Sequence, residues 1–259
     1  MKRVLITGGP TNEYIDEVMK ITNMSSGKIA IELAKLFVDN GYDTTLMLTK
    51  TIKSPVLDGL ETKENFCLER FETTDDLYDL LLVASTTAKF DLIIHSAAVA
   101  DYKPEFSFRL EDMAKELADA LACCNGMDMD VIEKTFLNIM KNPQCKINDD
   151  TKISSVEPNL TVKLGLTPKL ISKLREWFAD AYICGFKLLE NVSEAELIDA
   201  AKKQLDRCKT NMVFANDLAE LRKGNMARLV VTPNGYNNIK VDGAEGIFHL
   251  LNIVLTMNN

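Results

Sequence analysis

The sequence predicts an α/β fold of Rossmann-like type: a mostly parallel sheet with helices on both faces. Short runs such as Val4–Thr7 and Asp91–Val99 are nearly continuous in apolar residues, as buried parallel strands are. These runs alternate along the chain with segments of helical periodicity, and this alternation is typical of βαβ units. We therefore expect residues 1–259 to form a single α/β domain that carries one insertion.

The first helix has clear boundaries in the sequence. Ser25-Ser26-Gly27 precedes apolar residues at helical spacing, so either serine is the expected N-cap. Asn40-Gly41 is the expected stop. The remaining elements are a strand at Thr44–Leu48, a helix at Asp75–Ala84, a strand at Leu160–Leu164, a helix opening at Pro168, a strand at Tyr182–Leu188, a helix at Ser193–Cys208, strands at Met212–Ala215 and Leu229–Thr232, and a helix from about Gly243 to Thr256.

One segment, residues 103–160, interrupts this alternation. Two helical stretches, near Leu110–Cys124 and Asp130–Met140, flank Asn125-Gly126. A parallel crossover can need only about a dozen residues, so most of this length is an insertion. Residues 105–150 hold ten acidic and five basic side chains. The insertion is either a surface elaboration or a dimerisation or lid element.

Composition excludes several classes of protein. The net charge of −8 argues against binding to nucleic acid or to anionic membranes. No apolar run is long enough to span a bilayer, and no signal-peptide cleavage region follows the first strand, so we expect a cytoplasmic protein. The six cysteines lack CxxC spacing and there are only two histidines, so no metal site can be read from the chain.

Polar segments that follow the strands are the candidate sites, because open α/β sheets bind ligands at the carboxyl ends of their strands. Gly8 and Gly9 allow close approach of a phosphate, although a simple tight turn explains them equally well. Ser25, Ser26 and Gly27 could bind an anion at a helix start, with helix capping as the alternative. Helix capping gives the Asn23 side chain no role, and its amide could donate to an oxyanion or a carbonyl oxygen.

The third strand ends in His95-Ser96-Ala97-Ala98-Val99-Ala100-Asp101. The small residues would admit a bulky ligand, and Asp101 could accept a hydrogen bond, hold a metal ion or simply cap a turn. His95 is more typical of a core histidine than of an acid or base. Lys152 could approach phosphates or be a solvated lysine, and Phe186 could stack on a base or be a core aromatic.

Taken together, these motifs resemble the phosphopantothenate–cysteine ligases. The resemblance covers Val4 to about Asp217 and is closest to the stand-alone bacterial type, so we expect no flavin-decarboxylase region. The motifs occur in the order of that family: ITN-x-SSG, SAAVAD, KISS, LTPKLI, GFKL and AND.

The resemblance implies a reaction. A nucleoside triphosphate with Mg²⁺, CTP in preference to ATP, would activate 4′-phosphopantothenate as an acyl-nucleotide, and the amine of cysteine would attack it. The product is 4′-phosphopantothenoylcysteine, an intermediate in coenzyme A biosynthesis. A shared active site in the family implies a homodimer.

The resemblance also gives the residues roles. Asn23 would polarise the acyl group and Lys152 would face the phosphates, which makes both catalytic. Ala97, Ala98, Asp101 and Lys20 would contact the phosphopantothenate. The nucleotide would contact Gly8, Gly9, Ser25, Ser26, Gly27, His95, Ser96, Ala97, Asp101, Lys152, Pro168, Lys169, Leu170, Ile171, Phe186 and Lys203.

Two features depart from the family pattern. Met19 stands where the family has an arginine that binds the substrate phosphate across a dimer interface, so that either Lys20 replaces it or affinity is reduced. The acidic insertion is longer than the family's dimerisation arm. Two alternatives remain: a catalytically lapsed nucleotide-binding protein on the same fold, and a nicotinamide-dependent oxidoreductase. An oxidoreductase of this kind would use a Tyr-x-x-x-Lys pair. The chain has that spacing only at Tyr236 and Lys240, near its C-terminal end and outside the motifs named above, and Tyr182 is followed at this distance by Phe186.

Overall fold

The computed structural model describes residues 1–147 and 152–257, and the chain divides into two compact units. The first unit comprises residues 1–11, 23–99 and 168–259, and the second comprises residues 12–22 and 100–167. The predicted single domain stays an expectation, and residues 148–151 of the predicted insertion lie outside the described part of the chain.

The first unit is built on an eight-stranded sheet in the order β13-β12-β11-β10-β6-β1-β4-β5. The strands from β11 to β5 run parallel, and β12 and β13 extend the sheet as antiparallel strands. This confirms the predicted fold class. The strand bounds are β1 Arg3–Gly8, β4 Asp43–Thr49, β5 Phe66–Phe71, β6 Leu92–His95, β10 Tyr182–Leu189, β11 Met212–Asp217, β12 Ala227–Thr232 and β13 Gly235–Asp242.

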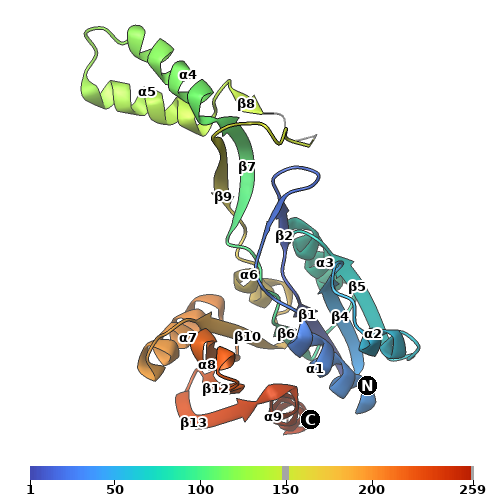
Figure 1. Ribbon diagram of the computed structural model, residues 1–259. Coiled ribbons are helices and arrows are strands. Elements are labelled where there is room, and N and C mark those ends of the chain that lie inside the picture. Colours follow the sequence, from blue (N-terminus) through green and yellow to red (C-terminus); the bar gives the residue numbers. More distant parts are fainter. Residues whose placement is uncertain (148–151, 258–259) are drawn as a thin grey trace. The chain divides into compact units, whose positions relative to one another are not determined.

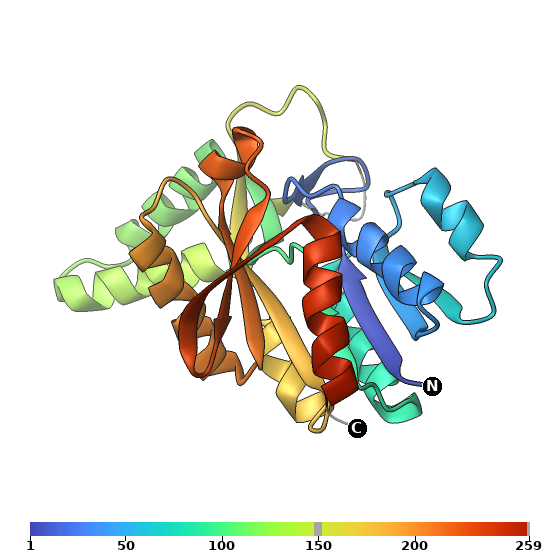
Figure 2. The same cartoon turned by 90° about the horizontal axis from the view of Figure 1, so that it is seen from below.

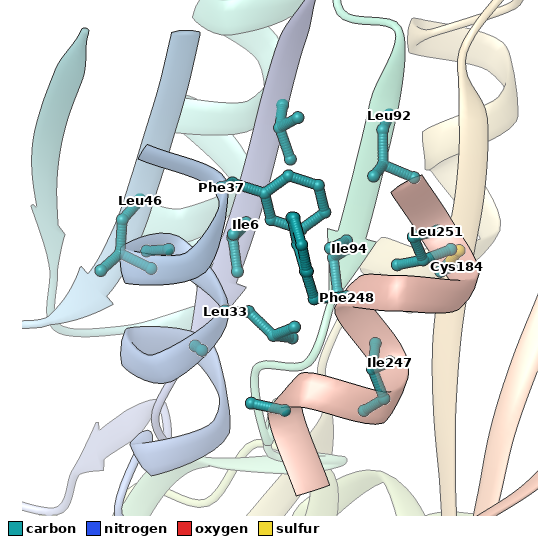
Figure 3. Packing of buried hydrophobic residues seen from close by; sticks show 14 of the residues in the cluster. Ile6, Leu33, Phe37, Leu46, Leu92, Ile94, Cys184, Ile247, Phe248 and Leu251 are labelled. Carbon is teal, nitrogen blue, oxygen red and sulfur yellow. The ribbon is translucent and has the colours of Figure 1, made fainter. Parts of the chain in front are cut away.

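Helices cover both faces of this sheet (Figures 1 and 2). On one face, Phe37 of α1 packs edge-to-face on Phe248 of α9, with ring centroids 5.0 Å apart (Figure 3). On the other face, Leu81 of α3 and Leu174 of α6 are fully buried in a second cluster, and Leu205 of α7 belongs to a third. The helix bounds are α1 Lys28–Asp39, α2 Pro55–Leu60, α3 Thr74–Thr87, α6 Leu170–Trp177, α7 Glu194–Cys208, α8 Leu218–Arg222 and α9 Gly243–Met257.

The start of α1 corrects one prediction. The N-cap is Gly27, in the left-handed conformation with φ +66°, and no side chain caps the helix. The prediction that Ser25 or Ser26 is the cap was therefore wrong. The predicted stop at Asn40 is confirmed, and Gly41 follows it with φ +80°.

The second unit contains an antiparallel sheet that the sequence did not reveal. β7, Tyr102–Arg109, pairs with β8, Lys146–Ile147, and with β9, Leu160–Leu166. β2, Asn12–Tyr14, and β3, Lys20–Thr22, form a hairpin in the same unit. The two predicted helices are present as α4, Leu110–Ala122, and α5, Met129–Lys141 (Figure 1).

A small core holds this unit together. Phe106, Phe108 and Met113 are buried there, with Ile139 and Cys145 packed against them. Burial of side chains of this size stabilises a fold by roughly 1.5–3 kcal/mol each. Pro104 lies inside β7, and the pairing with β9 shifts register between Pro104 and Phe106. A proline in such a run argues against a central strand, which is why the strand was missed.

Candidate active site at the carboxyl ends of β1 and β6

The segments after β1 and β6 continue side by side beyond the regular sheet. Ser96 donates from both its backbone N–H and its hydroxyl to the Thr7 carbonyl, at 3.1 and 2.7 Å. The Ala98 N–H donates to the Gly9 carbonyl at 2.8 Å. Two segments that were singled out separately in the sequence therefore form one edge of the first unit.

Asn23 ties a third predicted segment to this edge. Its Nδ2 lies 3.1 Å from the Ala98 carbonyl oxygen and 3.2 Å from that of Val99. Both carbonyls accept from the same amide nitrogen, which carries two N–H donors. The side chain therefore holds the ITN-x-SSG loop against the SAAV segment. Its predicted role of polarising an acyl carbonyl stays a prediction, and it requires at least one of these bonds to be exchanged for a ligand.

The three predicted glycines lie where the chain packs closely. A Cβ on Gly8 would lie 2.2 Å from the Cβ of Ala30 in α1, and one on Gly9 would lie 2.4 Å from the Thr49 hydroxyl. One on Gly27 would meet Ile52 at 2.7 Å. These glycines place the amino-terminal end of α1 directly beside the end of β1. Helix amino-terminal ends carry partial positive charge and orphan N–H groups, so the edge can accept an anion.

His95 is a buried and hydrogen-bonded histidine. Its Nδ1 lies 2.9 Å from the Thr7 hydroxyl, and the residue is only 6% exposed. Burial lowers the pKa of His95 from 6.5 to about 4, because the charged imidazolium would lose its hydration. The ring is therefore neutral at physiological pH. Its predicted nucleotide contact stays a prediction.

The predicted residues at the start of α6, on α7 and on β10 differ in how far their side chains are exposed. Leu170 is 1% exposed and belongs to the core, so only its backbone could touch a ligand. Pro168 and Lys169 are exposed. Phe186 is half-buried and lies 5.3 Å from Phe214, ring to ring. The two others are Ile171, half-buried against the core, and Lys203, exposed and paired with Asp199 at 2.7 Å.

The second unit carries Lys20, Asp101 and Lys152, all with exposed side chains. Lys20 lies in β3, with its Nζ 5.8 Å from the centre of the Tyr14 ring. The Asp101 carbonyl accepts a hydrogen bond from the Thr167 N–H at 3.1 Å. These residues have the charge and the exposure that their predicted contacts require.

Sequence reasoning missed Asp16, which is 3% exposed. Its Oδ1 accepts from the N–H groups of Val18 and Met19 at 2.7 and 2.6 Å. Its Oδ2 accepts from the Ile153 N–H at 2.9 Å. The bonds from Met19 and Ile153 are the main reason why the pKa of Asp16 lies below its usual value. No signal in the sequence marked it, because its partner lies 137 residues away.

A cavity of about 1080 Å³ opens at the amino ends of the parallel strands, lined by Asp91, Arg175 and Tyr182 among others. The guanidinium of Arg175 donates there to the carbonyls of Lys209, Ala179 and Ala181 and to the Asn211 side chain. These bonds hold the surrounding loops together, and they occupy the guanidinium of Arg175 so that it is not available to a ligand. We therefore keep the candidate site at the carboxyl ends of the strands.

In residues 1–147 and 152–257, no group of three or more His, Cys, Asp or Glu side chains could hold a metal ion. Over the same residues, no helix is long and apolar enough to cross a membrane. The six cysteines all fall within these ranges and are free thiols.

Comparison with known proteins identifies relatives of this chain. The family model of the DNA/pantothenate metabolism flavoprotein C-terminal domain matches residues 1–130, half of the chain. The coenzyme A biosynthesis bifunctional protein CoaBC of Thermococcus kodakarensis is 31% identical over 218 residues, which are 84% of this chain and 41% of that protein. The corresponding protein of Methanocaldococcus jannaschii is 29% identical over 243 residues, 94% of this chain and 47% of that protein.

A solved structure extends the match to the whole fold. The DNA/pantothenate metabolism flavoprotein from Streptococcus pneumoniae superimposes with a TM-score of 0.75 at 28% identity, covering 100% of both chains. The chain spans less than half the length of the two CoaBC proteins. On the family match and the shared architecture together, the chain belongs to the family of DNA/pantothenate metabolism flavoprotein C-terminal domains, the phosphopantothenate–cysteine ligase family that its motifs resemble.

Proposed function

We propose that this protein joins 4′-phosphopantothenate to L-cysteine. The substrate carboxylate attacks the α-phosphate of a nucleoside triphosphate, forms an acyl-nucleotide and releases pyrophosphate. The amine of cysteine then attacks the acyl carbon, the amide bond forms, one proton leaves the nitrogen, and the nucleoside monophosphate departs with the former carboxylate oxygen. This places the protein in coenzyme A biosynthesis.

The observation that carries the proposal is the junction made by Asn23. Its amide links the ITN-x-SSG loop to the carbonyls of Ala98 and Val99, so two of the family motifs meet at one sheet edge beside the amino-terminal end of α1. Family membership supports the same reaction. Catalysis of this kind depends on neutralising phosphate charge and on positioning a mixed anhydride for the amine.

In this proposal, the lysines bind phosphate groups and the uncharged residues contact the acyl group and the nucleoside. Lys152 faces the triphosphate, and Lys20 supplies a point charge for the substrate phosphate in place of the arginine that Met19 replaces. Asn23 orients the acyl group, and the small residues Ala97 and Ala98 leave room for it. Pro168 and Lys169, which are exposed, contact the base and ribose of the nucleotide together with Phe186.

Mg²⁺ would arrive bound to the triphosphate, so that the protein needs to supply only one or two carboxylate ligands. Magnesium sites of this kind use one or two carboxylates together with phosphate oxygens and water, so a dedicated protein cage is not needed. Asp101 is the motif carboxylate that would hold it. The ion supplies neutralisation of phosphate charge. We propose CTP as the preferred nucleotide, a cytoplasmic location and a homodimer.

The proposal is tested by incubating the protein with phosphopantothenate, cysteine, Mg²⁺ and either CTP or ATP. Pyrophosphate should appear in proportion to phosphopantothenoylcysteine, faster with CTP. Absence of pyrophosphate with both nucleotides, at enzyme concentrations suited to slow turnover, would contradict the ligase function. Binding of nucleotide without turnover would instead favour a catalytically lapsed protein, the alternative that Met19 motivates.

A further inference from the structure

The turn between β2 and β3 is closed by a buried carboxylate. The Ile15 N–H donates to the Met19 carbonyl at 2.9 Å, which completes the backbone of the turn. Asp16 Oδ1 accepts from the N–H groups of Val18 and Met19. A turn of this kind needs one carboxylate oxygen only.

The second oxygen of Asp16 acts outside the hairpin. Oδ2 accepts from the Ile153 N–H at 2.9 Å, and Ile153 is itself 5% exposed. This bond joins two stretches of the same unit, residues 12–22 and 100–167. Ile153 directly follows Lys152 in the chain. The hairpin that carries Met19 and Lys20 is therefore bonded to the backbone next to the KISS lysine.

Charge strengthens the link. Hydrogen bonds to an ionised acceptor are roughly twice as strong as neutral ones, and three N–H groups donate to this carboxylate. The positive charge of Lys152 is close enough to favour the ionised form of Asp16 as well. Asp16 is thus an anion at neutral pH that accepts the Ile153 N–H and is favoured in this form by the charge of Lys152.

We propose that Asp16 is a positioning residue for Lys152: its carboxylate fixes the backbone at Ile153 and so orients the lysine that acts on the phosphates. The proposal rests on the proposed function for the role of Lys152. The anchoring itself rests only on the geometry of the second unit, and it can be measured without any turnover.

Asp16→Asn isolates the long-range bond. The asparagine Oδ1 can still accept from Val18 and Met19, so the turn keeps its closing bonds. The other side-chain atom is now an N–H donor and faces the N–H of Ile153, so that bond is lost. Asp76→Asn is the matched control, because Asp76 also accepts two backbone N–H bonds, from Glu72 and Thr73 at 3.0 Å each, but does so in the first unit.

The first measurement is amide hydrogen exchange of the full chain at neutral pH. Asp16→Asn should accelerate exchange at Ile153 at least tenfold, whereas Asp76→Asn should leave that amide unchanged. The second is a double-mutant cycle on kcat with Asp16→Asn and Lys152→Ala. Asp16→Asn should lower kcat about tenfold with little change in KM for cysteine, and it should have almost no further effect once Lys152 is alanine.

The outcomes separate the two claims. Unchanged exchange at Ile153 overturns the anchoring, and fully additive effects of Asp16→Asn and Lys152→Ala overturn the positioning role. An inactive wild-type protein overturns the proposed function instead, and the exchange rate at Ile153 still decides whether Asp16 anchors the lysine segment.

Discussion

At the scale of single residues, Asn23 has a structural role in addition to the chemical role that we propose for it. Replacing it with alanine removes two hydrogen bonds to the carbonyls of Ala98 and Val99. We expect Asn23→Ala to cost about 1–3 kcal/mol of unfolding free energy. Its kcat should fall by about 100-fold, with accumulation of the acyl-nucleotide.

The control for Asn23 is its neighbour Met24, whose side chain is fully exposed. Met24→Ala should change neither the denaturation midpoint nor kcat. Wild-type turnover in Asn23→Ala would remove Asn23 from the mechanism.

His95 gives a prediction for the dependence of stability on pH. Its pKa is about 4 in the folded protein and close to 6.5 in the unfolded chain, so below pH 6.5 the unfolded state binds more protons. The stabilisation is complete above pH 6.5 and is lost as the pH falls towards 4, by roughly 3 kcal/mol in total. Urea unfolding at pH 7 and pH 4.5 should show a smaller loss in His95→Gln than in the wild type.

If both proteins lost the same stability between those pH values, the buried histidine would not be neutral as described. The Thr7 hydroxyl, 2.9 Å from Nδ1, remains as a partner for the glutamine side chain.

At the scale of elements, the start of α1 depends on Gly27. Alanine there would need φ +66° and would place its Cβ 2.7 Å from Ile52 and 3.1 Å from Leu48. The control is Gly41, which has φ +80° and where an added Cβ would meet no atom within 4 Å. Gly41→Ala should cost only the conformational strain of about 1–2 kcal/mol, and Gly27→Ala should cost at least about 1 kcal/mol more.

Equilibrium urea unfolding of the two glycine variants measures the difference. Equal losses of stability would mean that the helix start adapts to a side chain, and the close packing of Gly9 and Gly27 would then not shape the site.

The sequence could predict most elements because their burial follows simple periodicity. β1, with five buried residues in succession, and α1, with an apolar face, were found close to their actual bounds. β5 was missed because it lies at the sheet edge with alternating exposure, and β7 because Pro104 interrupts it. The cap at Gly27 was misassigned because serine is the commoner cap, whereas the left-handed backbone at φ +66° and the close contact with Ile52 explain the glycine.

The candidate site was predictable only in part. Residues next to strand ends, such as Ser96 and Ala98, could be placed from the sheet alone. The bond from Ile153 to Asp16 could not, because periodicity carries no information about which distant loop a carboxylate meets.

At the scale of the whole molecule, α4 and α5 present apolar side chains to solvent. Leu137 and Met140 of α5 are 47% and 48% exposed. Burial of such side chains is the usual role of an apolar helix face, so we expect the chain to be a homodimer in which α5 takes part. Sedimentation velocity should give twice the mass of one chain, and Leu137→Glu with Met140→Glu should give monomers.

A dimer that persists in this double variant would favour the interpretation of the insertion as a surface elaboration. Glu133→Gln, on the same helix and exposed, serves as the control and should leave the dimer intact.

The proposed reaction is tested most directly by following one oxygen atom. Phosphopantothenate labelled with ¹⁸O in its carboxylate is converted with cysteine, Mg²⁺ and CTP or ATP, and the products are analysed by mass spectrometry. An acyl-nucleotide intermediate predicts one ¹⁸O atom in the nucleoside monophosphate and none in pyrophosphate. Label in orthophosphate, with release of a nucleoside diphosphate, or no label in any phosphate product would contradict the account.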